Sequence, residues 1–336
     1  MTWDILGHEW AVNLLQEHVA RDRLRHAYLL IGPRGVGRRT LALRLAQAVN
    51  CPQPAAAGDP CRVCRACLQI ERMQYPDLTV VQAETEGGVL KVDQVRELQH
   101  SLALAPYEAR YRVALLLRFE EAHASAANAL LKTLEEPPAQ VIMLLTASSQ
   151  ESLLPTIVSR CEPLRLRPLA LEDVAQGLQT RWQAPEAQAT LLAHLSGGRP
   201  GYALALYREP ERLQQRQEWV QALFHLLKDG RVQRFNYIKE LTKDSNKEKE
   251  KPRDRLRQVV LAWLPVWRDV LLRAAGSAAP LINPDLEADV ARLASALGPQ
   301  TARQIVANLD RSLELLDKNA NPQLVGEVLM LDLPRF

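Results

Sequence analysis

Short apolar runs alternate with stretches of helical periodicity up to Leu166. The runs that predict buried strands cover residues 26–31, 78–81, 113–117 and 141–145. Between them, apolar positions at three- and four-residue spacing predict helices over residues 9–21, 40–46, 92–104 and 124–136. Continuous apolar strands separated by amphipathic helices are typical of a parallel sheet covered on both faces. The sequence therefore predicts an α/β domain.

Beyond Leu166 the strand pattern stops and helical periodicity continues alone. Residues 171–207 predict a small helical bundle, and residues 211–336 predict a further helical domain. Residues 243–252 have mixed charge and predict a solvated linker or loop. We therefore expect three domains, over residues 1–167, 168–208 and 209–336.

Composition and charge narrow the class of protein. Of 336 residues, 47% are hydrophobic and 24% are charged, which is typical of a soluble globular chain. The formal net charge of +3 permits contact with nucleic acid but does not argue for it. No run approaches the roughly 20 apolar residues that span a bilayer, and the N-terminus lacks the pattern of a secretory signal. We expect a cytoplasmic protein with no membrane partner.

A glycine-rich segment joins the first predicted strand to the next helix. In a phosphate-binding loop, G-x-x-x-x-G-K-[S/T], backbone amides cradle phosphate at the N-terminus of a helix. Gly32 and Gly37 have the required spacing, with Gly35 between them. The context of strand, loop and helix predicts a phosphate loop, and a simple glycine-rich turn is the alternative.

The loop lacks the residues that hold magnesium. Arg38 and Arg39 occupy the lysine and hydroxyl positions, and Thr40 comes one residue late. One residue along a helix turns a side chain by about 100°, away from the metal position. We interpret Gly32, Gly35, Gly37 and Arg38 as a vestigial phosphate loop. Whether it binds nucleotide stays open, because Arg38 keeps a positive charge that can contact phosphate.

The acids of an ATPase are also missing from the neighbouring strand. An ATPase needs one carboxylate for the metal and one to polarise water at that strand's end. Leu117 and Arg118 stand there, while Glu120 and Glu121 follow two or three residues later. We therefore do not expect this chain to hydrolyse ATP.

Four of the five cysteines fall between residues 51 and 67. Cys51, Cys61, Cys64 and Cys67 have the pattern C-x9-C-x2-C-x2-C. In a reducing compartment this spacing favours tetrahedral coordination of a structural Zn²⁺. An iron–sulfur cluster and four unligated thiols are the alternatives.

Several motifs together point to one family. They are His26–Leu29 leading into the glycine loop, the cysteines inserted after the loop's helix, the run Asn128–Pro138 with the sequence NALLKTLEEPP, and Ser159-Arg160-Cys161. With these motifs the chain resembles the delta-prime and gamma/tau subunits of the bacterial DNA polymerase III clamp loader, which belong to the AAA+ class. The resemblance covers about residues 5–207, and the tail matches at residues 319–324.

The resemblance implies a fold. It also indicates which type of subunit the altered loop and strand-end residues match. The expected fold is an AAA+-like P-loop domain with a parallel sheet and a zinc module at 51–67, then a small helical lid domain and an all-α collar-type domain for oligomerisation. Gamma/tau subunits keep the P-loop lysine, hydroxyl and strand-end acids, so the residues found here resemble delta-prime. Gly201 stands where an active subunit's lid offers an arginine, with Arg199 close by.

The implied function is that of a non-catalytic stator. In the family, the arginine of Ser-Arg-Cys, here Arg160, points into the ATP site of a neighbouring gamma/tau subunit and acts in trans. Implied partners are the gamma/tau and delta subunits, primer–template DNA within the assembly, and the sliding clamp indirectly. Two alternatives remain: an active gamma/tau-like ATPase that uses Thr40 with Glu120 or Glu121, and a zinc-bearing nucleic-acid-binding module.

Overall fold

The computed structural model describes residues 3–85, 87–243 and 251–336. Most of the predicted charged linker over residues 243–252 lies outside the described residues. The chain forms two compact units, one of residues 1–177 with 198–202 and one of residues 178–197 with 203–336. The three-domain division stays a prediction.

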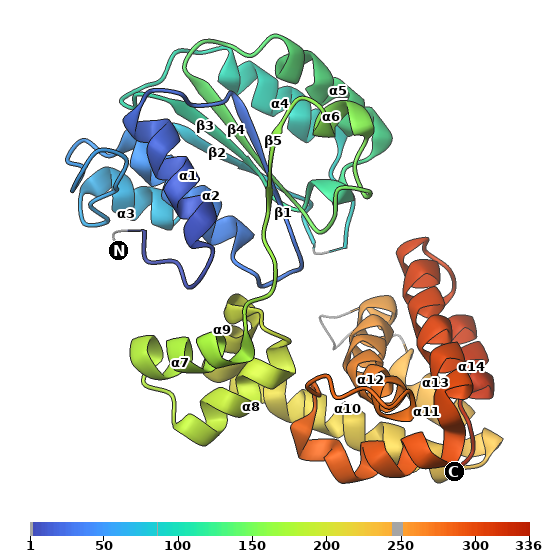
Figure 1. Cartoon of the computed structure of the whole chain (residues 1–336). Helices are drawn as coiled ribbons and strands as arrows, with labels where there is room; N and C mark the ends of the chain where they lie inside the picture. The colour runs from blue at the N-terminus through green and yellow to red at the C-terminus, as the bar shows by residue number, and fades with distance from the viewer. Residues whose placement is uncertain (1–2, 86, 244–250) are drawn as a thin grey trace. The chain divides into compact units, whose positions relative to one another are not determined.

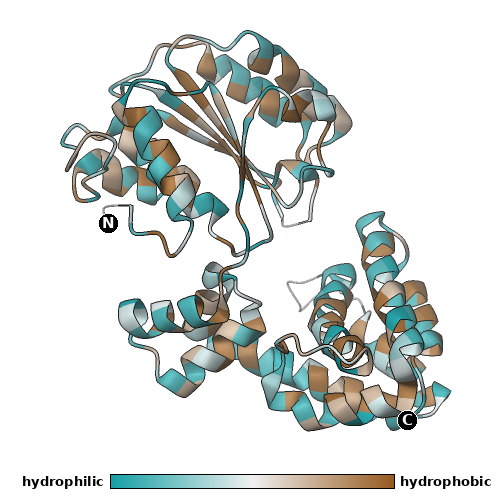
Figure 2. Ribbon diagram, viewed as in Figure 1, coloured by the Kyte–Doolittle hydropathy of each residue, from teal (hydrophilic) through white to brown (hydrophobic). Residues whose placement is uncertain are grey.

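A five-stranded parallel sheet forms the centre of the first unit (Figure 1). The strands lie in the order β2-β3-β4-β1-β5. Their bounds are β1 Ala27–Ile31, β2 Leu78–Val81, β3 Arg112–Leu116, β4 Val141–Ala147 and β5 Glu162–Arg165. The central strands β1, β3 and β4 are buried along their whole length, and Figure 2 shows them as hydrophobic. Burial on both faces explains why these strands are continuous apolar runs in the sequence.

Successive side chains of β1 enter two different cores. Tyr28 and Leu30 pack on one face of the sheet, and Leu29 and Ile31 pack on the other. Helices on both sides close these cores (Figure 1). On the first face lie α1 (Glu9–Ala20), α2 (Arg38–Asn50) and α3 (Arg65–Glu71), and on the second lie α4 (Val92–Leu102), α5 (Ala124–Glu135) and α6 (Pro155–Val158).

Two elements of this unit were not predicted. The strand β5 pairs only with β1, and its alternating polar residues give no apolar run. An edge position tolerates Pro163, which cannot donate a backbone hydrogen bond. The helix α3 is only seven residues long, too short for helical periodicity to stand out. The predicted class, a parallel α/β fold followed by helices, is confirmed.

The rest of the described chain is helical. It comprises α7 (Leu171–Trp182), α8 (Glu186–Ser196), α9 (Pro200–Arg208), α10 (Pro210–Lys228), α11 (Arg231–Leu241), α12 (Pro252–Ala274), α13 (Glu287–Asp317) and α14 (Pro322–Asp332). Trp263 and Trp267 of α12 are fully buried in the core of the second unit. Gly298 interrupts α13 with a non-helical conformation just before Pro299. Among the described residues, no helix combines the length and apolar character needed to cross a bilayer.

Candidate functional site

The predicted phosphate loop joins β1 to α2 at the carboxyl edge of the sheet. Gly35 and Gly37 have φ of 81° and 114°, a region that side chains rarely adopt. The Gly32 N–H donates to Ala147 O of the neighbouring strand β4 at 3.1 Å, which fixes the start of the loop. Gly37 is the N-cap residue of α2. The loop thus keeps the strand–loop–helix geometry in which a helix N-terminus attracts anions.

The start of α9 packs directly on this loop. The Gly201 N–H donates to the carbonyl oxygen of Gly35 at 2.8 Å. A Cβ on Gly35 would come within 2.8 Å of Tyr202 Cβ, and one on Gly201 would come within 2.9 Å of Gly35 O. The guanidinium of Arg199 lies 4.7 Å from the ring centre of Tyr202. The backbones of Gly35 and Gly201 are therefore in close contact, with no room for a side chain on either residue.

The residues that follow the loop point to different environments. Arg38 is 7% exposed, and its Nη1 has no hydrogen-bond partner among the described residues. Arg39 and Thr40 are exposed on α2. Burial lowers the pKa of Arg38, while the charge of Glu120 acts to raise it. Arg38 is thus a buried cation whose charged form is favoured by the charge of Glu120.

Glu121 lies at the centre of an ion-pair network at the end of β3. Its carboxylate accepts from Arg118 Nε at 2.9 Å, from Arg34 Nη2 at 3.1 Å and from the Gly87 N–H at 3.0 Å. The Glu121 side chain is only 7% exposed. Arg118 adopts a left-handed conformation and donates its backbone N–H to Thr146 Oγ1 at 2.9 Å. Glu121 therefore joins the phosphate loop to the strand end.

Glu120 lies beside this network and has one engaged oxygen. Its Oε1 accepts from the Ser148 N–H at 3.2 Å, and its buried Oε2 has no partner in the described part of the chain. Its charge acts on the buried Arg38. Glu121 thus pairs with arginines of the loop and strand end, and the charge of Glu120 acts on Arg38.

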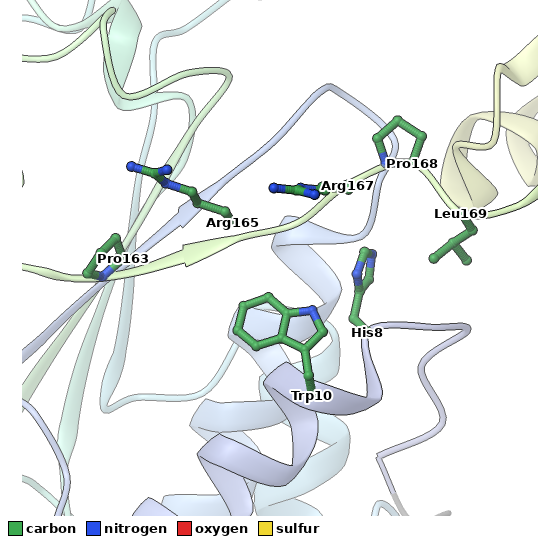
Figure 3. Close-up of a pocket in the computed structure, with 7 residues that line it drawn as sticks. All are labelled: His8, Trp10, Pro163, Arg165, Arg167, Pro168 and Leu169. Carbon is green, nitrogen blue, oxygen red and sulfur yellow. The ribbon is translucent and has the colours of Figure 1, made fainter.

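A pocket of about 530 Å³ lies beside the loop, and the sequence did not predict it. Its lining residues are His8, Trp10, Pro163, Arg165, Arg167, Pro168 and Leu169 (Figure 3). Because a carbonyl only accepts, His8 Nε2 donates to Val36 O of the loop at 3.0 Å, and the ring is the Nε2–H tautomer. Trp10 is half exposed. His8 precedes α1 with a left-handed backbone conformation, which no sequence pattern predicts. The pocket is therefore visible only in the folded structure.

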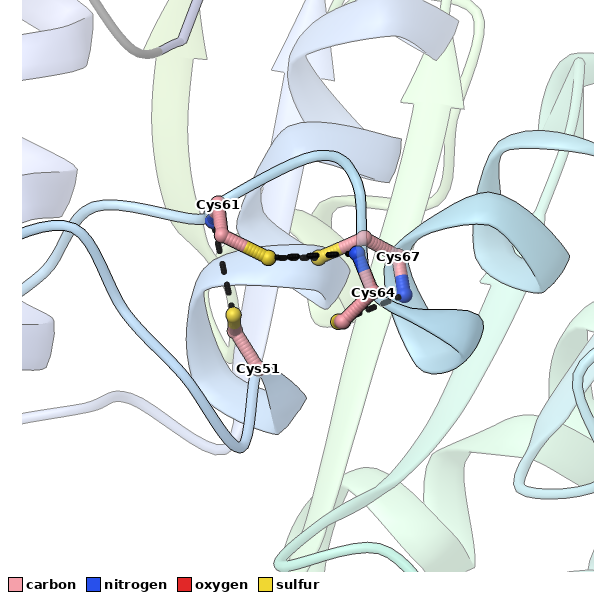
Figure 4. A group of neighbouring side chains, drawn as sticks. All are labelled: Cys51, Cys61, Cys64 and Cys67. Carbon is pink, nitrogen blue, oxygen red and sulfur yellow. Dashed lines mark hydrogen bonds between the residues drawn. The ribbon is translucent and has the colours of Figure 1, made fainter.

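The four predicted cysteines come together after α2 (Figure 4). Their sulfur atoms all lie within 4.8 Å of one another, and those of Cys61 and Cys67 are 4.0 Å apart. Cys51 is the C-cap residue of α2, and Cys64 is the N-cap residue of α3. Backbone N–H groups of Cys61, Cys64 and Cys67 donate to the sulfurs of Cys51, Cys61 and Cys64, respectively. The cluster has the donors to hold a metal ion.

Backbone N–H groups and burial have opposite effects on the pKa values of these thiols. Burial raises the pKa of Cys67. Burial also acts to raise the pKa of Cys61, but the N–H groups of Val63 and Cys64 outweigh it and lower the pKa to about 6. Because N–H donors favour the thiolate, they favour the form of sulfur that binds a metal ion.

Polar side chains of α2 hold the cysteine segment in place. Gln47 Nε2 donates to Cys67 O at 2.7 Å, and buried Arg44 forms an ion pair with Glu71 of α3. The Trp3 indole N–H donates to Gly58 O at 3.1 Å in the preceding loop. Such supporting contacts orient ligands of a metal site.

Arg160 lies on the turn between α6 and β5. Its Nη1 donates to Thr156 O at 2.9 Å and to Ser159 Oγ at 3.4 Å, and its Nη2 donates to Glu135 Oε1 at 2.7 Å. The Arg160 side chain is 34% exposed. The next residue, Cys161, is buried, and burial raises the pKa of its thiol to about 12. The turn thus presents an arginine at the surface and anchors a neutral thiol in the core.

Comparison with known proteins identifies the family. The model of the family described as DNA polymerase III, delta subunit, matches residues 7–170, and its C-terminal model matches residues 210–334. The delta-prime subunit of Bacillus subtilis DNA polymerase III is 31% identical over 321 residues, which cover 95% of this chain and 94% of that protein. This chain belongs to the delta-prime family. The Pseudomonas aeruginosa delta-prime subunit is 39% identical over 65% of this chain and 66% of its own length.

A second group of relatives matches only in part. The tau subunit of Escherichia coli DNA polymerase III is 35% identical over 176 residues, which cover 52% of this chain and 27% of that protein. The delta-prime and tau likenesses agree with the family predicted from the glycine loop, the cysteines and Ser159-Arg160-Cys161.

Packing at Gly35 gives a first testable prediction. We expect Gly35→Ala to lower the free energy of unfolding by about 2–4 kcal/mol, because it combines a left-handed backbone with a clash against Tyr202. Gly37→Ala has a left-handed backbone but no atom within 4 Å of the added Cβ, so it should cost only about 1 kcal/mol. Urea unfolding of both variants measures the difference, and equal losses would contradict the packing.

Burial of His8 predicts a pH dependence. Burial, the largest cause, lowers the pKa of His8 below its ordinary value of 6.5, while the bond to Val36 and the charge of Glu9 oppose it. The unfolded chain therefore binds a proton at higher pH than the folded one, and stability falls as pH drops below about 6.5. His8→Asn should lose part of this dependence. Thermal unfolding from pH 7.5 to 5.0 measures it, and identical slopes would refute the assignment.

Proposed function

We propose that this chain is a delta-prime-type subunit of a DNA polymerase III clamp loader that does not hydrolyse ATP itself. It serves as a stator and supplies Arg160 to the ATP site of a neighbouring gamma/tau-type subunit. The observation that carries this proposal is the contrast between two groups of arginines. Arg34 and Arg118 pair with Glu121, whose side chain is 7% exposed, whereas Arg160 pairs with Glu135, whose side chain is 51% exposed.

The chain's own loop supports the absence of hydrolysis. A magnesium-dependent ATPase needs a hydroxyl ligand on the loop and free carboxylates at the strand end. Arg38 is buried at the lysine position, and Thr40 is exposed. Of the two acids that a rearranged ATPase could use, Glu120 or Glu121, the second already accepts from two guanidinium groups and a backbone N–H. The loop, with Gly32, Gly35, Gly37 and Arg38, is vestigial in this proposal.

Electrostatics support a role for Arg160 in trans. Phosphoryl transfer spreads negative charge over the oxygens of the transferred group. A guanidinium from a neighbouring subunit stabilises that charge and raises the rate by about 10³–10⁵. The Arg160 side chain is partly exposed and extends from a turn anchored by buried Cys161.

We also propose that Cys51, Cys61, Cys64 and Cys67 hold a structural Zn²⁺. With bonds of about 2.3 Å, tetrahedral zinc separates its sulfurs by about 3.8 Å, close to the 4.0 Å between Cys61 and Cys67. Four thiolates leave no open position for water, so the ion would act as a staple. The N–H groups that donate to three of the sulfurs suit thiolates bound to a cation.

The proposed partners follow from the relatives. Gamma/tau-type subunits would receive Arg160, and a delta-type subunit would complete the loader. The assembly would act on primer–template DNA and, indirectly, on the sliding clamp. The C-terminal helices over residues 209–336 are proposed as the oligomerisation domain and residues 168–208 as the lid.

The role of Arg160 is tested in an assembled loader. Arg160→Ala should leave assembly intact and lower hydrolysis at the adjoining gamma/tau site by about 10³-fold or more in single-turnover measurements. The chain alone should show no magnesium-dependent ATP hydrolysis. Arg96→Ala is the matched control, because Arg96 is an exposed arginine on α4 paired with Asp93. Unchanged hydrolysis in the Arg160→Ala complex, or brisk turnover by the chain alone, would refute the proposal.

Zinc content tests the cysteine cluster. The chain purified without chelator should carry about one zinc per chain, and Cys64→Ser should lose it. The melting temperature of that variant should fall by about 5 °C or more, because metal binding contributes to folding. Cys161→Ser is the control, since this cysteine lies outside the cluster and should keep the zinc. Full zinc content in Cys64→Ser would exclude this ligand set.

A further inference from the structure

We infer that Glu135 is the positioning residue of Arg160, which gives a role to the Glu135-Glu136-Pro137-Pro138 end of the NALLKTLEEPP run. The inference rests on the proposed action of Arg160 in trans. Glu135 Oε1 accepts from Arg160 Nη2 at 2.7 Å, across 25 residues of sequence. A charge-assisted bond of this length holds a guanidinium in one orientation more firmly than a neutral bond does.

The location of Glu135 is unfavourable for its own helix. α5 ends at Glu135, and Glu136 is its C-cap residue. A carboxylate in the last turn meets the partial negative charge of the helix C-terminus, which disfavours it. Lys132, one turn earlier, is the residue type that suits this end. Helix stability therefore does not account for Glu135, whereas the opposite charge of Arg160 does.

The backbones of Glu135 and Arg160 are both flanked by residues of one hydrophobic core. Leu134, beside Glu135, and Ile157 and Cys161, on either side of Arg160, all belong to the core on one face of the sheet. On α5, Thr133 is further fixed by a hydrogen bond from Gln99 of α4 at 2.9 Å. Since both backbones are anchored, the carboxylate defines a fixed point for the guanidinium.

The remaining contacts of Arg160 come from its own turn. Nη1 donates to Thr156 O and Ser159 Oγ, which secure one side of the guanidinium. Glu135 secures the other side, while Nε makes no hydrogen bond within the described residues. This leaves N–H groups for an incoming phosphate and removes rotations that the long side chain would otherwise have.

Glu136 supplies a matched control. It is the adjacent carboxylate, it is exposed, and its side chain makes no hydrogen bond or ion pair in the part of the chain that the structure describes. A general effect of charge at the end of α5 would be equal at both positions. An effect through Arg160 would be confined to Glu135.

The test measures ATP hydrolysis by the assembled loader containing the full-length chain. Glu135→Ala should lower kcat at the adjoining gamma/tau site by about 3- to 10-fold, between the effect of an exposed ion pair and that of a misplaced group. The KM for ATP should change less than about 2-fold, because the bond acts on the transition state. Glu135→Asp should recover part of the rate, and Glu136→Ala should match the unmodified chain.

The double variant separates this inference from the proposed function. In an Arg160→Ala background, Glu135→Ala should have no further effect on kcat. If Arg160→Ala itself has no effect, the proposed action in trans fails. If Arg160→Ala lowers kcat while Glu135→Ala leaves it unchanged, raises it, or lowers it equally in the Arg160→Ala background, the positioning role fails and the action of Arg160 stands.

Discussion

The arrangement of the glycine loop and the end of β3 depends on one side chain, the carboxylate of Glu121. It is almost fully buried and accepts from Arg34 of the phosphate loop and Arg118 of the strand end. A buried carboxylate is stable only when its charge is compensated, so the two arginines and Glu121 require one another. Together they join the loop and the strand end within one chain.

In the proposed function, this internal pairing would let the phosphate-loop architecture persist without ATP hydrolysis. A loop of backbone N–H groups at a helix N-terminus attracts negative charge. In this chain, the charge of Glu120 acts on the buried Arg38, and the start of α9 packs on Gly35. The architecture is therefore stabilised by contacts that the chain itself supplies. A subunit with such a loop can be a fixed element against which active neighbours move.

Arg160 is also paired with a carboxylate, but this carboxylate is exposed. Arg160 is held by Glu135 and by its own turn, and both stand on the core beneath α5 and α6. An arginine prepared in this way loses less freedom when it meets a phosphate. In the proposed loader, Arg160 pairs with an exposed carboxylate and would act on a neighbouring subunit, whereas Arg34 and Arg118 pair with the buried Glu121.

The sequence by itself determined the parallel α/β class, the cysteine cluster and the family. Buried parallel strands must be apolar throughout, and metal ligands and phosphate loops require particular residues at short spacings, so local patterns carry this information. Tertiary structure alone decided that Glu121 joins Arg34 to Arg118, that Glu135 meets Arg160, and that His8 bonds to the loop. These partners lie up to 87 residues apart in the chain. Charged side chains at such separations leave no periodic signal, and only the folded core brings them together.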